Sequence, residues 1–396
     1  MNAARWGDVA ACHESGKGAA KEATCRDAPA TARRPAVARA DHSVDSVTVH
    51  AGAAADRLSM GMRGWNVFML CSTNAPMSGD EMDQVTPERR RGRGAATNRS
   101  GRFEALARTA VDDGWERDED LPLLRTEVAV DASRSVIARN TSPDIPFDRS
   151  VNPYRGCEHG CVYCYARPSH AFLGLSPGLD FETRILAKPD APRLLEAELA
   201  RPGYRVAPIA IGTNTDPYQP VEKRLRIMRG VMEVLQGCAH PVTVVTKGAI
   251  VTRDADILGA MGRDGLARVG ISLTTLDRRL ARAMEPRAAA PERRLAAIRT
   301  LSEAGCPVLV MVAPVIPGLN DTELEALLEA ARDAGAVAAS YVVLRLPREV
   351  AELFRDWLAE AYPARAAKVM KRVRALHGGR DYDPSWGRRM RGVGVE

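Results

Sequence analysis

The chain has 396 residues, of which 45% are hydrophobic and 27% are charged, and its formal net charge is +6. This composition is ordinary for a globular protein with one large domain or two medium ones, and eight cysteines are too few for a disulfide-rich scaffold. The mild positive charge is compatible with an anionic ligand or nucleic acid but indicates neither. The N-terminus has no apolar core of signal-peptide length, and the apolar run at 65–71 is too short to span a bilayer. The sequence therefore predicts a cytoplasmic protein without a membrane partner.

Residues 1–100 differ from the rest of the chain, because they are rich in Ala, Gly, Ser, Asp and Arg and show no helical or strand period. They are predicted to be a flexible, low-complexity, basic region. Within them, the run PERRRGRGAATNRSGR at 87–102 indicates either an unfolded, solvated tail or an arm that binds nucleic acid. Internal methionines, the last of them Met82, also allow a translation start downstream of Met1.

The remaining chain is predicted to divide into three parts. A lead-in segment at 101–150 contains a short helix at 103–114 and an extended stretch at 121–140. The core follows at 151–362, and a C-terminal helix with a basic tail occupies 363–396.

The core alternates between short apolar runs and amphipathic stretches. The predicted strands are 208–213, 241–247, 267–275, 307–315 and 340–347, and the predicted helices are 222–237, about 253–262, 291–305, 320–335 and one that begins at 348. The strands are continuously apolar, as in a parallel sheet that helices cover on both sides. With one further strand before 155, this makes about six βα units, which suits a partial, open barrel or a doubly wound sheet. In either case ligands are expected at the carboxyl ends of the strands.

The stretch RGCEHGCVYCYA at 155–166 places Cys157, Cys161 and Cys164 in one loop. Thiolates are soft ligands that select zinc, copper(I) or iron–sulfur clusters. A [4Fe–4S] cluster on three cysteines would keep one iron open for a substrate or cofactor. A zinc site of three cysteines and one histidine, His159 or His170, is the alternative, although a second C-x2-C pair is absent.

The spacing C-x3-C-x-aromatic-C, with Tyr163 in the aromatic position, resembles the radical S-adenosylmethionine (SAM) superfamily. Longer segments, among them GTNTDPYQPVEK, SLTTLD and APVIPGLND, resemble its spore photoproduct lyase-like branch, also described as DNA repair photolyase-like. The resemblance covers roughly residues 100–390. It implies an α/β fold with a partial (β/α)6 barrel.

The resemblance also implies two cofactors and a reaction. The three cysteines would hold a [4Fe–4S] cluster, and the open iron would chelate the amino and carboxylate groups of SAM. An electron from a donor such as flavodoxin or ferredoxin would then cleave SAM to a 5′-deoxyadenosyl radical, which takes hydrogen from the substrate.

Further cofactor contacts are implied at the strand ends. Asn214, Thr215 and Asp216 would approach the SAM amino group, although a turn built by Asn, Asp and Pro217 explains the segment equally well. Lys247 would meet the SAM carboxylate, and Tyr163 would belong to the same site. Ser272 would contact SAM, unless it is a core hydroxyl bonded to the backbone.

Other polar residues are open to two interpretations. Asn320 could face the adenosine, but with Glu323 it has the spacing of a capping box. Tyr218 and Gln219 could face the substrate, and Tyr154 and Tyr165 could shield the cluster from water. The charged residues between strands 267–275 and 307–315 indicate either a phosphate site or solvated charge, with solvated charge favoured: Glu285, Arg287, Arg293 and Arg294.

The substrate implied by the resemblance and by the mild basicity is a nucleic acid or nucleotide. Spore photoproduct lyases carry a cysteine just before the acidic segment, whereas here that stretch reads Gly212 to Thr215, so thymine-dimer reversal by the same route is doubtful. Radical modification of a protein or small molecule is the second hypothesis. A zinc-stabilised nucleic-acid-binding module without catalysis is the third, and the long βα array argues against it.

Overall fold

The computed structural model describes residues 85–87, 89–104 and 123–393, all of which belong to one compact unit. Residues 1–84 of the predicted flexible region 1–100, the alternative start codons and most of the predicted helix at 103–114 lie outside these residues. Within the described ranges, no helix combines the length and the apolar character needed to cross a membrane.

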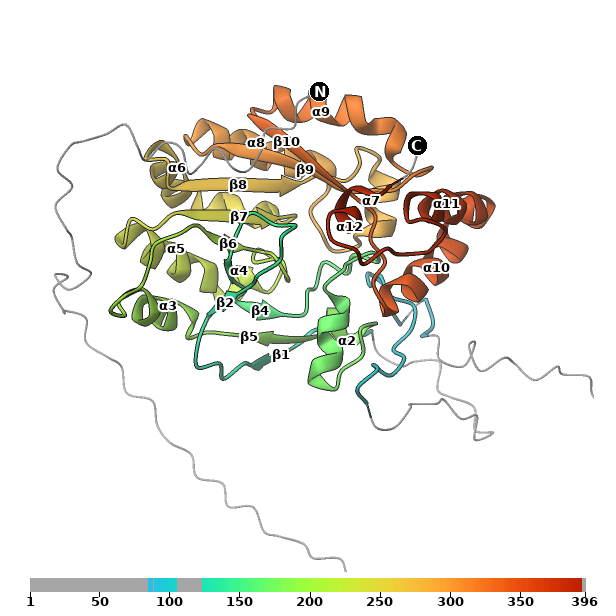
Figure 1. Ribbon diagram of the computed structural model, residues 1–396, viewed down its shortest axis with the longest axis horizontal. Helices are drawn as coiled ribbons and strands as arrows, with labels where there is room; N and C mark the ends of the chain where they lie inside the picture. The colour runs from blue at the N-terminus through green and yellow to red at the C-terminus, as the bar shows by residue number, and fades with distance from the viewer. Residues whose placement is uncertain (1–84, 88, 105–122, 394–396) are drawn as a thin grey trace, which may run out of the picture. The chain divides into compact units, whose positions relative to one another are not determined.

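A seven-stranded, mostly parallel sheet forms the centre of the fold (Figure 1). Its strand order is β10-β9-β8-β7-β6-β3-β2, and only β2 runs antiparallel to its neighbour. The strands are β2 (Ile137–Arg139), β3 (Arg149–Val151), β6 (Ile209–Ile211), β7 (Val242–Thr246), β8 (Ala267–Ser272), β9 (Val308–Val315) and β10 (Ala338–Val343). Six parallel strands in an open sheet confirm the α/β class and the partial (β/α)6 barrel predicted from the sequence.

Helices cover the outer face of this sheet. They are α3 (Ala191–Leu199), α4 (Glu222–Leu225), α5 (Ile227–Gly237), α6 (Ala255–Arg263), α8 (Pro291–Glu303) and α9 (Leu324–Asp333), with short 3-10 turns η4 (Ala249–Asp254) and η5 (Asp321–Glu323). The apolar face predicted for 222–237 is present, because Met228, Met232 and Leu235 are fully buried against the sheet. Apolar helix stripes and apolar strands thus form one continuous core.

The helix predicted over 222–237 is interrupted at Arg226, which adopts a left-handed conformation with φ 54°. The physical reason is the buried carboxylate of Glu222. It accepts hydrogen bonds from the backbone N–H groups of Ile227 and Met228, each at 3.1 Å, and so caps a new helix start.

A second, smaller sheet lies beside the first, in the order β1-β5-β4. Its strands are β1 (Glu127–Val130), β4 (Tyr154–Arg155) and β5 (Arg184–Ala187), with α2 (Asp180–Thr183) and η3 (Arg167–Leu173) next to them. The sequence did not predict this sheet, since its strands are only two to four residues long and β1 is mostly exposed.

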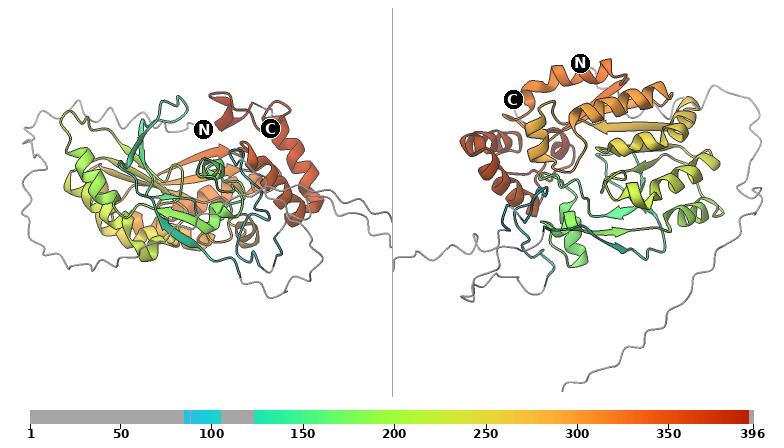
Figure 2. Two further views of the ribbon diagram at one scale, coloured as in Figure 1. Left: turned by 90° about the horizontal axis from the view of Figure 1, so that it is seen from below. Right: turned by 180° about the vertical axis from the view of Figure 1, so that it is seen from behind.

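The remaining helices lie at the end of the large sheet where the parallel strands finish (Figures 1 and 2). They are α7 (Arg278–Met284), α10 (Glu349–Ala361), α11 (Pro363–Leu376) and α12 (Arg388–Arg391). A second apolar cluster joins α10 and α11 to the cysteine loop through Cys161, Val162 and Tyr163. The C-terminal helices therefore form one wall around that loop.

The described residues of the basic run 87–102 are not an unfolded tail. Arg93 and Thr97 are buried, and the Arg93 guanidinium donates to the backbone oxygens of Glu182 and Leu124, each at 2.9 Å. The backbone N–H of Leu179 donates to the Thr97 oxygen at 3.1 Å. Composition predicted a solvated segment here because it cannot report these long-range backbone partners.

Candidate functional site

The cysteine loop follows β4 and needs two glycines for its shape. Gly156 and Gly160 have φ values of 78° and 68°, in the left-handed region that side chains disfavour. A Cβ on Gly156 would lie 2.9 Å from the Phe181 carbonyl oxygen, and one on Gly160 would lie 2.7 Å from a Glu182 carboxylate oxygen. The pattern RGCEHGC therefore specifies a tight loop packed directly on α2.

The loop gathers the three thiols. Cys157 and Cys161 are buried, Cys164 is partly buried, and none of them forms a disulfide. Burial raises the pKa of Cys157 well above its usual value, with further contributions from Asp216 and the two other thiols. Burial likewise raises the pKa of Cys161 to about 12. The thiols are thus close enough to influence one another, and without a metal Cys157 and Cys161 carry protons.

The arrangement does not favour the zinc alternative. Among the described residues, no group of three or more His, Cys, Asp and Glu side chains is close enough to hold one metal ion. The ring of His170 contacts the Arg184 oxygen through Nε2 at 3.1 Å, and Nδ1 of His159 contacts the Asp216 carboxylate at 3.3 Å. An iron–sulfur cluster needs no such tight set, because each thiolate binds a different iron.

Asp216 lies at the carboxyl end of β6 and joins three elements. Its carboxylate accepts from the Thr246 hydroxyl and the Lys247 N–H, both at 2.6 Å, and from the Tyr218 N–H at 2.9 Å. Its Oδ2 lies 3.3 Å from Nδ1 of His159. Burial acts to raise the pKa of Asp216, but His159 and these hydrogen bonds outweigh it and hold the pKa at about 2. The turn interpretation is therefore correct, and the turn also lies beside the cysteine loop.

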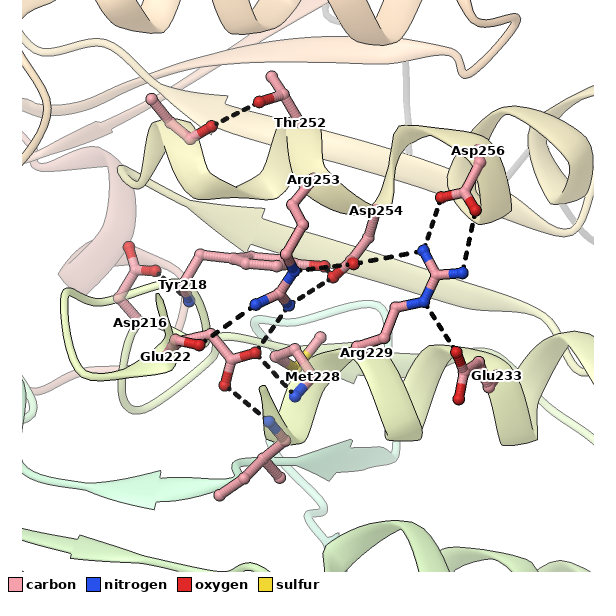
Figure 3. Close-up of polar contacts among 12 residues, drawn as sticks. Asp216, Tyr218, Glu222, Met228, Arg229, Glu233, Thr252, Arg253, Asp254 and Asp256 are labelled. Carbon is pink, nitrogen blue, oxygen red and sulfur yellow. Dashed lines mark hydrogen bonds and ion pairs between the residues drawn. The ribbon is translucent and has the colours of Figure 1, made fainter. Parts of the chain in front are cut away.

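A polar network beneath Asp216 fixes the loop that follows it (Figure 3). The Tyr218 hydroxyl donates to Asp254 at 3.0 Å, and Arg253 bridges Asp254 and Glu222 at 2.8 and 2.7 Å. Tyr218 is fully buried in this network, so it does not face a substrate cavity as the sequence suggested.

Gln219 is also buried, and it clamps the cysteine loop. Its side-chain oxygen accepts from the Glu158 N–H at 2.8 Å, and its Nε2 donates to the Gly156 oxygen at 3.2 Å. The Glu158 carboxylate returns the contact by accepting from the Val221 N–H at 2.6 Å. The predicted substrate role of Gln219 is wrong for a physical reason: both of its polar atoms are engaged by backbone groups.

Lys247 ends β7 with its ammonium 5.8 Å from the centre of the Tyr163 ring. Within the described ranges, this ammonium has no hydrogen bond or ion pair. Burial acts to lower the pKa of Lys247, but Cys161 and Glu285 outweigh it and raise the pKa. A cation in such a place is available to an anionic ligand.

Ser272 ends β8 and is buried, and its hydroxyl lies 3.4 Å from the Ala313 oxygen. This contact fits a core hydroxyl bonded to the backbone. Asn214 is exposed, and its backbone N–H donates to Asn152 at 3.0 Å. The two residues thus lie at the same strand edge as Asp216 and Lys247 but in different surroundings.

Glu285 and Arg294 form a buried ion pair, which corrects the interpretation of both as solvated charge. The Glu285 carboxylate also accepts from the Tyr163 hydroxyl and, at 3.0 Å, from the Thr274 hydroxyl. Burial acts to raise the pKa of Glu285, but Arg294 and Lys247 outweigh it and lower the pKa. The pair fixes the ring of Tyr163, and no local pattern could have found it because the partners lie in a loop and a helix nine residues apart.

Asn320 does not cap a helix. Its side-chain oxygen accepts from the Ile316 N–H at 2.6 Å, and its Nδ2 donates to the backbone oxygens of Thr274 and Pro314 at 2.7 and 3.0 Å. Glu323 binds the Thr275 hydroxyl instead of closing a capping box. Asn320 therefore ties the loops after β8 and β9 together.

The two flanking tyrosines differ. Tyr154 is buried, with its hydroxyl donating to Glu222, whereas Tyr165 is 47% exposed. The Arg345 guanidinium lies over the Tyr165 ring at 4.3 Å, and its Nη1 contacts the Met390 sulfur at 3.1 Å. Tyr154 is therefore placed to exclude water, while Tyr165 forms part of an accessible rim.

Contacts of Glu182 and Arg167 that the sequence did not predict also support the cysteine loop. The buried Glu182 carboxylate accepts from the Gly94 and Ala95 N–H groups, both at 2.8 Å, and pairs with Arg167 at 2.5 Å. Arg167 in turn donates to the Cys161 oxygen at 2.9 Å. The run at 93–98 is thus connected to the cysteine loop through two buried side chains.

Three neighbouring thiols, an available ammonium and a carboxylate-anchored turn thus lie together at the carboxyl ends of the strands. The profile of the radical SAM superfamily matches residues 151–331. An uncharacterised protein of Mycobacterium tuberculosis is 38% identical over 242 residues, which cover 61% of this chain and 70% of that protein. The chain belongs to the radical SAM superfamily, whose enzymes use a [4Fe–4S] cluster and SAM.

More distant relatives were also found. An uncharacterised protein of Methanocaldococcus jannaschii is 26% identical over 44% of this chain and 62% of its own length. Among solved structures, a spore photoproduct lyase mutant with bound AdoMet and dinucleoside spore photoproduct has a TM-score of 0.42 at 18% identity. This similarity covers 60% of this chain and 66% of that one. A methylornithine synthase has a TM-score of 0.34 at 15% identity.

The residues of this site fit the two cofactors chemically. Three thiols on one loop are the donor set that a cluster with one open iron requires. The SAM carboxylate needs a cation, and the Lys247 ammonium lies near Cys161 without a partner among the described side chains. Buried Tyr163 and Tyr154 keep the surroundings apolar, as one-electron chemistry demands.

Proposed function

We propose that Cys157, Cys161 and Cys164 hold the [4Fe–4S] cluster and that Lys247 binds the SAM carboxylate. The observation that carries this proposal is that three neighbouring thiols lie near the Lys247 ammonium, which has no hydrogen bond or ion pair among the described residues, at the carboxyl ends of the strands. When both are bound, cluster and cofactor supply one-electron cleavage of a sulfonium C–S bond and hydrogen-atom abstraction from the substrate.

The protein's own residues hold the parts of the site in position and shield the thiols from water. Asp216 holds the turn after β6 against the Lys247 backbone, so the strand ends keep a fixed spacing. Glu285 and Arg294 hold the Tyr163 ring beside Cys161, which excludes water from the thiols. Asn214 remains at the exposed side of the turn, where it can meet the SAM amino group, and Ser272 lines the same edge.

We propose a polyanionic substrate of the nucleic acid or nucleotide class. The support is the position of the charge: residues 363–396 hold nine Lys and Arg against three Asp and Glu, which equals the whole formal excess of +6. Helix α12 lies at the carboxyl end of the sheet (Figure 1), where Arg389 pairs with Asp144 at 2.5 Å. Trp386 is 58% exposed beside it, with the Arg389 guanidinium 4.1 Å over its ring. Exposed aromatic rings among arginines suit base stacking and phosphate contacts.

Anaerobic purification tests the cofactors. The protein should be brown, contain iron and sulfide, and release 5′-deoxyadenosine when dithionite and SAM are added. Cys161→Ala should abolish the colour and the product, while Cys306→Ala, a buried thiol outside the loop, should retain both. A colourless protein with stoichiometric zinc would contradict the proposal.

Salt-dependent binding tests the substrate class. Fluorescent single-stranded DNA and RNA should bind with an affinity that falls as salt rises, because phosphate contacts release counterions. Arg388→Glu together with Arg391→Glu should weaken binding at least tenfold, whereas Arg193→Glu on exposed α3 should not. Binding that ignores both salt and the first pair would point to a protein or small-molecule substrate.

A further inference from the structure

An open groove of about 550 Å³ lies on the surface next to the cysteine loop. It is lined by Thr126 and Val128 of the lead-in segment, Glu158 of the cysteine loop, and Pro220, Val221, Lys223, Arg224 and Arg287.

The groove is positive. Lys223, Arg224 and Arg287 are exposed, and within the described ranges neither Lys223 nor Arg224 has an ion pair. The single acidic group in the lining, Glu158, is already neutralised by Arg287 at 3.0 Å and bonded to the Thr126 hydroxyl at 2.8 Å. A partner that enters the groove therefore meets two cationic side chains without a counter-charge, Lys223 and Arg224, and no free carboxylate.

The groove adjoins the cysteine loop through Glu158. Glu158 follows Cys157 directly, and the Arg287 N–H donates to the His159 oxygen at 3.2 Å. A redox group that sits in or over the groove would thus lie beside the loop that carries the proposed cluster ligands.

We infer that this groove is the docking surface for an acidic electron-donor protein, an inference that rests on the proposed cluster function. The donor gives one electron to the oxidised cluster: a flavin hydroquinone becomes the semiquinone and releases a proton, and the cluster charge falls from +2 to +1. Electron-transfer complexes are small and weak, so a shallow groove with a few cations is sufficient. Opposite charges steer the encounter and set the association rate more than the affinity.

A nucleic acid is the less suitable occupant. Trp386 and the excess of arginine and lysine lie in the C-terminal segment, whereas the groove offers no exposed aromatic ring among its lining residues. Single-stranded nucleic acid depends on such rings for stacking.

The test uses the cluster-loaded protein and stopped-flow bleaching of the cluster absorbance. Photoreduced flavodoxin is the donor in one arm and dithionite is the reductant in the other. Lys223→Glu together with Arg224→Glu should lower the second-order rate constant with flavodoxin at least tenfold and flatten its dependence on salt. Iron content and the rate with dithionite should stay within twofold of the unmodified protein.

A matched control reverses two charges elsewhere. Lys368→Glu together with Lys371→Glu changes two exposed cations of α11 and should leave the flavodoxin rate unchanged. Equal rates in the unmodified protein and in the groove variant, or equal slowing by both double variants, would overturn the inference. Weaker binding of single-stranded DNA by the groove variant with an unchanged flavodoxin rate would overturn it too and assign the groove to nucleic acid.

Two further measurements distinguish a failure of the docking surface from a failure of the proposed cluster. In the unmodified protein the flavodoxin rate should fall steeply as salt rises, and a flat dependence would also overturn the docking surface. Absence of iron and sulfide in the unmodified protein would instead be a failure of the proposed cluster, visible before any donor is added.

Discussion

Nδ1 of His159 lies 3.3 Å from Oδ2 of Asp216, so a buried contact joins the cysteine loop to the turn after β6. The same carboxylate binds the Lys247 N–H at the end of β7. One acidic side chain thus aligns the proposed cluster ligands with the proposed cofactor cation. Mutations at this junction should therefore affect both the proposed cluster ligands and the proposed cofactor cation.

Asp216→Asn should weaken this junction. An amide has one acceptor oxygen, so at least one of the N–H and O–H donors now bonded to the carboxylate is left unsatisfied, which costs roughly 1–3 kcal/mol. Thermal unfolding should begin at lower temperature, and iron per chain should fall. Asp190→Asn, which changes an exposed carboxylate, is the control. Wild-type values for both readouts would contradict the role of Asp216.

Lys247→Met should separate cofactor binding from cluster binding. The ammonium is proposed to pair with the SAM carboxylate, and a charge-assisted bond of this kind contributes about 1.5–3 kcal/mol, or roughly 10- to 100-fold in affinity. Titration calorimetry should show this loss, while iron content stays normal because no thiol is altered. Lys247→Arg should recover part of the affinity. An unchanged SAM affinity in the methionine variant would exclude the carboxylate contact.

Glu285→Gln should destabilise the fold strongly. It leaves the Arg294 guanidinium buried without its counter-charge, a change that costs about 3–5 kcal/mol. Adding Arg294→Met should restore part of the loss, because the uncompensated charge is then removed. Denaturant unfolding measures both, with Arg293→Ala, at an exposed neighbour, as the control within about 0.5 kcal/mol. Equal losses of stability from Glu285→Gln and Arg293→Ala would show that Glu285 and Arg294 behave as solvated charges.

Gly94→Ala should disturb the cysteine loop from the side of the basic run. An added Cβ would lie 1.8 Å from the Gly160 carbonyl oxygen, so the backbone must move, at a cost of about 1–3 kcal/mol. Reduced iron occupancy and a lower unfolding temperature should follow. Gly237→Ala is the matched control, because its Cβ would meet nothing within 4 Å. Unchanged iron occupancy and unfolding temperature in Gly94→Ala would contradict a supporting role of the run at 93–98 for the cysteine loop.

His240 should make the stability depend on pH. Burial lowers the pKa of His240, and the nearby Arg149 lowers it further. Its Nδ1 faces the Pro241 oxygen at 3.0 Å and must carry the hydrogen, so Nε2 accepts from the Tyr204 hydroxyl at 2.9 Å. Protonation would therefore cost this bond as well as bury a charge.

The direction of this pH dependence follows from the lowered pKa of His240. The folded-state pKa of His240 lies below its ordinary value of about 6.5. Neutral His240 therefore makes its full contribution to stability above about pH 6.5, and this contribution is lost as the pH falls from there through the folded-state pKa. Urea unfolding between pH 5 and 8 should show stability declining on the acidic side, and His240→Gln should reduce the slope. The same slope in both proteins would assign the dependence to other groups.

Local patterns in the sequence determined much of the fold. Apolar runs such as 307–315 predicted parallel strands that are buried on both faces, since burial on a periodic element is written into its own residues. Cys157, Cys161 and Cys164 predicted a metal-binding loop, because their spacing alone brings three thiols together. Gly335 likewise marked the end of a helix, α9, which stops two residues before it.

Only the tertiary structure decided which polar groups serve the site and which serve the scaffold. Glu285 and Arg294 meet across a loop, Gln219 reaches back to the cysteine loop, and Glu182 binds a run nearly ninety residues before it. A charged residue has the same local sequence signature whether it faces water or a buried partner. The partner is set by chain topology, and the low dielectric of the interior then makes that pairing strong.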